Sequence, residues 1–495
     1  MSQLKKGALL SYFTIFLTNI IGLVLTPFII RSIGDAEYGL YTLIGAFVGY
    51  ISVLDFGLNN TIIRFVAKYR AEKDKKGEEN FLAITMLIYV VISVVIAIIG
   101  IILYFNLDVL FSNSLTLDEI AKAKVMFIIL IFNLVITLPG GAFTAICSGY
   151  EHFVFPRTIN IIRYIVRSVL VVGLLLYGGD AIGLVVLDTI MNVLVIVFNG
   201  YYVFKKLKVT FKLYEFQLPL VKEIFSYSVW IFIYALVYKM QWNAGQVVLG
   251  MNTDTVTVAI YAVGIMLGGY YGAFAGAING LLVPKATQMS VQKRSGTEYT
   301  NEMIKIGRLN SFLLFFILNG FILFGKDFIN LWLGESYINS WYIALCIMIV
   351  MSLPLIQAFG NSILEAKKKN RFKSVLSLTT VALGVFIGFY FSKIYGVFGV
   401  ILPLVLAMGF NSLIMIFYYK KIFGLKIRQF FINTLGKIFL ITSVLGIISY
   451  FIIIYFPILN WFDLFLQIFI YSLAYSLVVY FVVLNKFEKS LILTK

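Results

Sequence analysis

Apolar stretches of about 20 residues or more recur along almost the whole chain, from Ala8 to Leu484. A helix needs roughly 20 mostly apolar residues to cross about 30 Å of hydrocarbon, whereas barrel strands alternate apolar and polar positions. The pattern therefore predicts an all-α integral membrane protein. We expect about fourteen transmembrane helices, at residues 8–30, 38–58, 81–105, 122–147, 158–177, 181–203, 223–249, 257–282, 307–325, 338–359, 374–392, 396–417, 433–455 and 461–484.

The composition agrees with this interpretation. Hydrophobic residues make up 61% of the 495 residues and charged residues only 13%, which is more apolar surface than one globular core could bury. The bilayer must therefore be part of the solvent. No segment between the predicted spans is long enough to fold as a domain of its own, which argues against enzymes that need a large external catalytic loop.

The formal charge of +17 does not indicate nucleic-acid binding, because the cations lie in short segments between spans and form no separate basic domain. Topology explains them better. With a cytoplasmic N-terminus, the predicted inside segments hold 32 of the 40 Lys and Arg residues. The positive-inside rule then places both termini in the cytoplasm. The exceptions are five predicted outside and three within spans: Arg31, Lys122, Lys124, Lys326, Lys393, Arg163, Arg167 and Lys239.

The chain contains an internal repeat. The segment 138–157 is echoed by 353–371, and YGLY at 38–41 is echoed by VAIY at 258–261. Both offsets are close to 220 residues, which predicts two six-helix lobes related by a pseudo-twofold axis along the membrane normal. By analogy, a pair of such lobes with a site between them is typical of alternating-access transporters. The predicted parts are a first lobe at 1–203, a basic cytoplasmic linker at 204–222, a second lobe at 223–417 and two additional C-terminal helices at 418–495.

The segment 26–69, TPFIIRSIGDAEYGLYTLIGAFVGYISVLDFGLNNTIIRFVAKY, together with GYEHFVFPR at 149–157, resembles the polysaccharide-biosynthesis flippases. These belong to the multidrug, oligosaccharidyl-lipid and polysaccharide exporter superfamily. The resemblance implies a cationic cavity between lobes and transfer of a polyprenyl-diphosphate-linked oligosaccharide to the outer leaflet. It also implies that the partners are this lipid-linked substrate, the cell-membrane bilayer and polysaccharide assembly proteins.

Ionisable groups inside spans cost about 2.5 to 3.5 kcal/mol each on insertion scales, so each one requires an explanation. Arg163 and Arg167 lie four residues apart on one helix face, which they share with Asn160. Lys239 and Asn243 form a similar stripe in the seventh span. We predict that these five side chains bind the diphosphate of the substrate, because guanidinium and ammonium groups recognise phosphate oxygens.

The acids in the spans leave a second interpretation open. Asp188 of the sixth span lies near the depth of Arg167 on the antiparallel neighbour, and Asp55 could pair with Arg163 in the same way. Both aspartates are therefore candidates for ion pairing or coupling. Asp188 shares its face with Asn192 and Asn199. Three cations against two acids leave one positive charge, which a phosphate or an aqueous cavity would satisfy.

Other features of the sequence receive simpler explanations. Arg31 and Arg64 flank the resembling segment and are candidates for substrate binding, with interfacial anchoring as the alternative. Glycine at every fourth position from Gly264 to Gly280 predicts close helix packing. Two cysteines in apolar segments and the lack of a GxxxxGK[ST] loop predict no metal, no cofactor and no ATP-driven transport.

The sequence thus predicts a flippase that makes no covalent change, rather than an enzyme. A cation-coupled multidrug exporter of the same superfamily is the alternative, although the positive balance inside the spans disfavours it. A membrane-embedded glycan polymerase would need paired carboxylates or a metal site at a membrane face. The outer acids lie in short loops without such spacing: Asp35, Glu37, Asp118 and Glu119.

Overall fold

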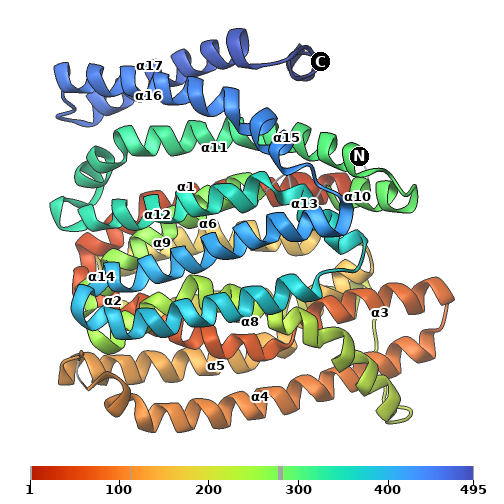
Figure 1. Ribbon diagram of the computed structural model, residues 1–495. Coiled ribbons are helices and arrows are strands. Elements are labelled where there is room, and N and C mark those ends of the chain that lie inside the picture. Colours follow the sequence, from red (N-terminus) through yellow and green to blue (C-terminus); the bar gives the residue numbers. More distant parts are fainter. Residues whose placement is uncertain (1–2, 113, 277–281, 494–495) are drawn as a thin grey trace. The chain divides into compact units, whose positions relative to one another are not determined.

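The computed structural model describes residues 3–112, 114–276 and 282–493, and long helices fill most of these ranges (Figure 1). Twelve helices in the described ranges are long and apolar enough to cross a membrane. One of them, α14 (Arg371–Phe423), has non-helical backbone at Gly396 and therefore holds two of the predicted spans. A further helix of 35 residues, α8 (Leu218–Asn252), matches the seventh predicted span. The predicted all-α membrane fold of about fourteen spans is confirmed.

The chain forms two compact units. Unit 1 holds Met1–Ala259 and Gly388–Val400, and unit 2 holds Ile260–Ile387 and Ile401–Lys495. Unit 1 includes α8, which the predicted boundary at 204–222 assigns to the second lobe. Compactness and repeat symmetry divide a chain by different criteria, so the lobe boundaries stay a prediction. The elements wholly in unit 1 are α1 (Gln3–Ile33), α2 (Asp35–Ile51), the 3₁₀ turn η1 (Ser52–Asp55), α3 (Leu58–Glu72), α4 (Lys75–Phe111), α5 (Leu117–Gly149), α6 (Val154–Leu176), α7 (Ala181–Tyr201), the π-helix η2 (Tyr202–Lys206) and α8.

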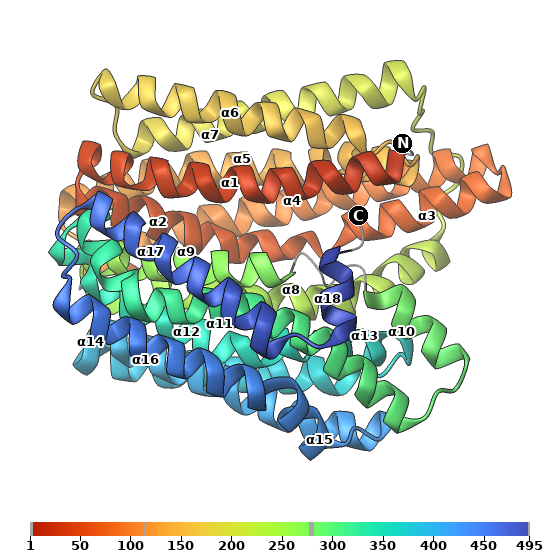
Figure 2. The same cartoon turned by 90° about the horizontal axis from the view of Figure 1, so that it is seen from above.

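Helix α5 occupies the centre of unit 1 and packs against α2, α3, α4 and α7. Helices α6 and α7 run side by side, with α1 against α6 (Figure 2). The start of α2 approaches α9 (Thr255–Gly276) very closely, because a Cβ atom on Gly39 would overlap the carbonyl oxygen of Thr255. Gly45, on the same helix, faces open space. Packing therefore requires the absence of a side chain at Gly39, whereas at Gly45 it does not.

The predicted basic linker is fastened to the start of α4. The Asn80 side-chain oxygen accepts hydrogen bonds from the backbone N–H of Tyr214 at 2.8 Å and of Glu215 at 3.1 Å. The Glu79 carboxylate accepts hydrogen bonds from the hydroxyls of Thr210 and, at 2.7 Å, Tyr214. The hydrogen bond that Tyr214 donates to Glu79 raises the pKa of the Tyr214 phenol, because the carboxylate favours the protonated hydroxyl. The segment is consequently attached to α4 by several hydrogen bonds and is not a flexible linker.

Hydrogen bonds join the end of α8 to residues 388–400, a later segment of the chain that belongs to unit 1. The side-chain amide of Asn252, at the end of α8, donates to the backbone oxygen of Phe389 at 2.9 Å and to the Ser392 hydroxyl at 2.7 Å. Both acceptors belong to the bend of α14 around Gly396, whose φ of 51° lies in the left-handed region. The bend between two spans is therefore held by a side chain of the seventh span.

Unit 2 contains the remaining helices. Glycines of α9 allow the close packing that their spacing predicts, because a Cβ on Gly264 would lie 2.6 Å from Ile343 and one on Gly268 would lie 2.7 Å from Ile347. Gly280 of the same series lies outside the described residues. The elements wholly in unit 2 are α10 (Leu282–Val291), α11 (Gly296–Leu333), the 3₁₀ turn η4 (Glu335–Tyr337), α12 (Ile338–Ile356), α13 (Ala358–Ala366), α15 (Ile427–Phe431), the π-helix η5 (Ile432–Gly436), α16 (Lys437–Tyr455), α17 (Trp461–Val478), the π-helix η6 (Val479–Val483) and α18 (Lys486–Leu493).

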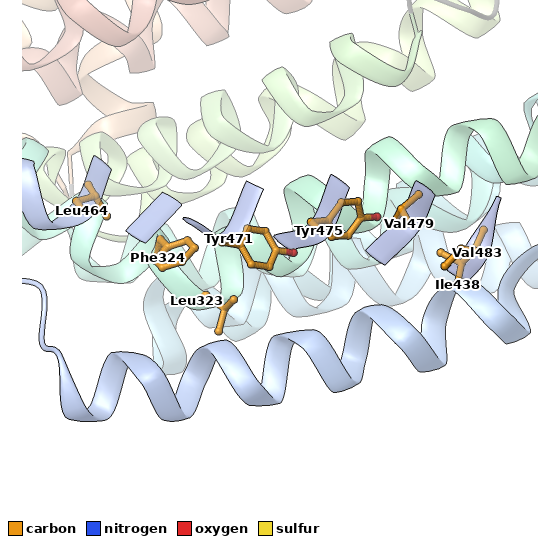
Figure 3. Packing of buried hydrophobic residues seen from close by; sticks show 8 residues of the cluster. All are labelled: Leu323, Phe324, Ile438, Leu464, Tyr471, Tyr475, Val479 and Val483. Carbon is orange, nitrogen blue, oxygen red and sulfur yellow. The ribbon is translucent and has the colours of Figure 1, made fainter. Parts of the chain in front are cut away.

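The two additional C-terminal helices pack on α11. Figure 3 shows Leu323 and Phe324 of α11 beside Tyr471 and Tyr475 of α17, with Ile438 of α16 in the same buried cluster. The Tyr475 hydroxyl also donates to the backbone oxygen of Phe312 at 2.7 Å. These helices are thus an integral part of unit 2.

An ion pair fastens the end of the chain to α11. Arg308 Nη2 donates to Glu488 Oε2 at 2.9 Å, and the two side chains are only 11% and 2% exposed. The same guanidinium donates to the backbone oxygens of Asn433 and Val483, each at 3.1 Å. Both acceptors lie in π-helices, which leave carbonyls without their usual partners. Arg308 therefore holds η5, η6 and α18 in place at once.

Candidate intramembrane site

The first part of the candidate site is a three-residue network in unit 1. Arg167 of α6 donates from Nη2 to Asp188 Oδ2 of α7 at 2.9 Å, and its Nε contacts the other carboxylate oxygen. The Tyr41 hydroxyl of α2 donates to the same carboxylate at 3.0 Å. The Arg167 and Asp188 side chains are 23% and 26% exposed, so the pair is only partly enclosed. The network links α2, α6 and α7.

This geometry agrees with the ion-pairing interpretation of Arg167 and Asp188, because the fork of the guanidinium matches the two oxygens of the carboxylate. The charge of Arg167 is therefore neutralised by a neighbouring helix. Sequence analysis did not select Tyr41 as a site residue. The sequence feature that could have pointed to Tyr41 is a phenol hydroxyl within an apolar span, in the segment that resembles the flippases.

Arg163 has a different environment. Its guanidinium lies 4.7 Å from the ring centroid of Tyr164, and its buried Nε has no hydrogen-bond partner among the described residues. Asp55 Oδ1 is also buried without such a partner, at a helix break where Phe56 and Gly57 have φ of 53° and 69°. The pairing of Arg163 with Asp55 that sequence suggests is therefore not formed. Arg163 lies on a ring of its own helix instead.

Lys239 of α8 faces α2 within unit 1. A Cβ atom on Gly49 would lie 3.6 Å from the Lys239 ammonium and 3.2 Å from the Asn243 side-chain nitrogen. A Cβ atom at position 49 would therefore crowd the Asn243 side chain and touch the Lys239 ammonium at ordinary van der Waals distance. Within the described part of the chain, Lys239 makes no ion pair and no hydrogen bond from its ammonium. Glycine at position 49 thus makes room for an uncompensated cation beside α2.

The other polar side chains of the predicted stripes form hydrogen bonds within their own helix or with a neighbouring helix. Asn160 donates to the backbone oxygen of Pro156 at 3.0 Å, one turn earlier on α6. Asn192 of α7 donates to Asn133 of α5 at 2.6 Å, and Asn199 donates to Thr144 of α5 at 3.1 Å. The α7 amides therefore contribute to packing between α5 and α7.

Arg31 and Arg64 lie at helix surfaces. Arg31 is exposed in the last turn of α1, and Arg64 is exposed on α3 with its guanidinium 5.9 Å from the Phe65 ring centroid. These positions suit interfacial anchoring, and substrate binding by either residue stays a prediction. Within the described ranges, no group of three or more His, Cys, Asp or Glu side chains could hold a metal ion.

Comparison with known proteins gives the family. A family model described as "Polysaccharide biosynthesis protein" matches residues 4–290, more than half of the chain. The chain belongs to this family. The "Uncharacterized membrane protein EpsK" of Bacillus subtilis (strain 168) is 22% identical over 329 residues. That match covers 63% of this chain and 62% of EpsK, so the chain spans less than two thirds of the curated relative.

Solved structures with the same fold are transporters and flippases by their titles. The lipid II flippase MurJ in an inward closed conformation has a TM-score of 0.73 at 17% identity, over 98% of this chain and 99% of its own. An inward-facing multidrug resistance MATE family transporter of the MOP superfamily has a TM-score of 0.61 at 14% identity. It covers 81% of this chain and 97% of its own. This polysaccharide biosynthesis protein therefore has the fold of that superfamily, and its length matches MurJ.

Proposed function

We propose that this protein is a flippase that moves a polyprenyl-diphosphate-linked oligosaccharide from the cytoplasmic to the outer leaflet of the cell membrane. Both termini lie in the cytoplasm in this proposal, in line with the distribution of Lys and Arg. The substrate crosses by alternating access and no covalent bond changes. The family name and the fold shared with MurJ support transport of a lipid-linked precursor.

The observation that carries the proposal is the charge balance inside unit 1. Arg167 is neutralised by Asp188, whereas Lys239 and Arg163 have no carboxylate partner among the described residues. Asp55 provides one further negative charge and is not paired with either cation. Both cations are partly buried on membrane-spanning helices. A charged side chain there costs about 2.5 to 3.5 kcal/mol on insertion scales, so a site that retains such cations is suited to an anionic ligand.

The chemistry of a diphosphate fits these groups. The Lys239 ammonium and the side-chain nitrogen of Asn243 lie together next to Gly49, and both can donate N–H hydrogen bonds to an anion. Arg163 adds a guanidinium whose Nε is free to donate to a phosphate oxygen. Arg167 and Asp188 then act as a structural pair that holds α6 against α7.

The test is leaflet translocation of a fluorescent polyprenyl-diphosphate oligosaccharide in proteoliposomes. We expect Lys239→Gln and Arg163→Gln each to slow translocation by roughly 10- to 100-fold, because a hydrogen bond to a charged group contributes about 1.5 to 3 kcal/mol. Lys326→Gln removes the same charge from an exposed position of α11 and should leave the rate unchanged.

The outcomes separate the alternatives. Translocation that survives both site substitutions would retain the flippase and remove this site. A wild-type protein that moves no such lipid but extrudes a cationic dye under an ion gradient would support the multidrug-exporter alternative, which the MATE-like fold also allows.

A further inference from the structure

Unit 2 contains a cavity of about 950 Å³ at the turn between α14 and α15. Three cationic side chains line it, and among the described residues no Asp or Glu does. Lys420, Lys426 and Arg428 are all exposed and form no ion pair within the described residues. We propose that this cavity binds the phosphate headgroup of an anionic phospholipid of the cytoplasmic leaflet.

The nearby acids are engaged elsewhere. On the first turns of α11, Glu298 pairs with Arg294 at 2.5 Å and Glu302 pairs with Lys305 at 3.9 Å. At the other side, the buried Glu488 is bound by Arg308. The positive charge of the cavity is therefore not cancelled by the carboxylates of the surrounding helices. An external anion is the complement that the cavity lacks.

The backbone of the turn is fixed from α11. Gly424 has a φ of 74°, and a Cβ on Gly296 would lie 2.7 Å from the Gly424 backbone oxygen. The Lys426 backbone N–H donates to the Thr300 hydroxyl at 3.1 Å, and Leu425 is 2% exposed. The three cations thus project from a rigid frame, which reduces the entropy lost when they bind one ligand.

The surroundings favour a lipid over free phosphate. Ile432 lines the cavity and is 56% exposed, and it continues into Phe439 and Leu440 of α16, which are 57% and 63% exposed. Apolar side chains this exposed on a membrane-spanning helix face acyl chains. The cavity therefore places phosphate-binding groups next to a lipid-facing surface. Basic pockets at the cytoplasmic ends of spans are a known way to bind anionic headgroups.

Binding at this place would act on the helices beyond it. The backbone oxygen of Asn433, which lines the cavity, accepts a hydrogen bond from Arg308, and Arg308 also binds Glu488 of α18. A bound headgroup would therefore stabilise η5 and the start of α16 in the arrangement that Arg308 holds. The proposal concerns unit 2 alone and does not depend on the identity of the transported substrate.

The experiment is native mass spectrometry of the purified full-length protein titrated with cardiolipin, with phosphatidylcholine as the zwitterionic comparison. The triple variant K420Q/K426Q/R428Q should lose at least about tenfold in cardiolipin affinity, because each cation near an anionic surface contributes severalfold. The control triple variant K205Q/K206Q/K212Q removes three exposed cations from the linker of unit 1 and should keep wild-type affinity. K420R/K426R keeps the charges and should also bind as the wild type does.

Several results would overturn the proposal. Equal losses in the two triple variants would mean that general basicity and not this cavity attracts the lipid. Unchanged binding in K420Q/K426Q/R428Q would exclude the cavity directly. Displacement of cardiolipin by millimolar inorganic phosphate would identify a site for a soluble anion. Displacement by an equimolar polyprenyl diphosphate would identify a site for the transported lipid instead.

Discussion

The substitution Asp188→Asn separates charge from shape in the Tyr41–Arg167–Asp188 network. Asparagine keeps an oxygen that can accept from the Tyr41 hydroxyl, but it leaves the Arg167 guanidinium without a counter-charge. Removing one partner of a fully buried ion pair costs about 3 to 5 kcal/mol. Because the two side chains are 23% and 26% exposed, solvent compensates part of this loss. We therefore expect a loss of about 2 to 3 kcal/mol.

The measurement is the thermal unfolding of the protein in detergent, followed by loss of the monodisperse peak. For a unit of roughly 270 residues, 1 kcal/mol corresponds to about 2 °C, so Asp188→Asn should lower Tm by roughly 4 to 6 °C. Asp108→Asn is the matched control. It breaks the pair with Lys124, in which Asp108 is 54% exposed, and should cost less than about 1 kcal/mol.

A double substitution tests the reasoning itself. Arg167→Gln with Asp188→Asn removes both charges, so the protein should recover most of the stability that Asp188→Asn loses. A double variant as unstable as the sum of the two single variants would refute an interaction between these charges. Wild-type stability of Asp188→Asn would show that Arg167 finds compensation from water, and that the pair is not structural.

Two further predictions concern packing and the C-terminal helices. Gly39→Ala should destabilise unit 1 by about 1 to 3 kcal/mol, because the added Cβ clashes with the backbone of Thr255. Gly45→Ala places its Cβ in open space and should raise Tm through the better helix propensity of alanine. Similar Tm values for the two variants would contradict the close approach of Gly39 to Thr255. Arg308→Gln should leave Glu488 buried and unpaired, so amide hydrogen exchange at residues 479–489 should increase at least tenfold, while Arg294→Gln, in an exposed pair, should leave it unchanged.

The sequence predicts the spans well because their signal is local. A run of about 20 apolar residues has few alternatives to a membrane helix. The Lys and Arg residues between the runs then predict the orientation of the helices through the positive-inside rule. The pairing of Arg167 with Asp188 can be predicted from the sequence for a similar reason. Adjacent antiparallel helices fix the relative depth of their residues, so two opposite charges at one depth are natural partners on the strength of the amino-acid sequence alone.

Contacts between segments far apart in the chain could not be predicted from the sequence. The partner of Arg308 lies 180 residues later in the chain, and the glycine beside Lys239 lies on a helix 190 residues earlier. Neither choice leaves a local pattern, because each depends on which faces of two helices meet. For Arg163 the sequence suggested a contact that does not form. Asp55 lies at a suitable depth to pair with it, but the Arg163 guanidinium lies on the Tyr164 ring instead.

The hydrogen bonds of Asn252 set an order of events during biosynthesis. Its acceptor Phe389 is made 137 residues later, which at about 5 to 20 residues per second means a delay of roughly 7 to 27 s. Throughout that interval the end of α8 presents an unpaired amide, although the rest of unit 1 up to Ala259 has already left the ribosome. Unit 1 is therefore completed only after much of unit 2 has been translated. A chain truncated before Gly388 would therefore retain an Asn252 amide without these two acceptors.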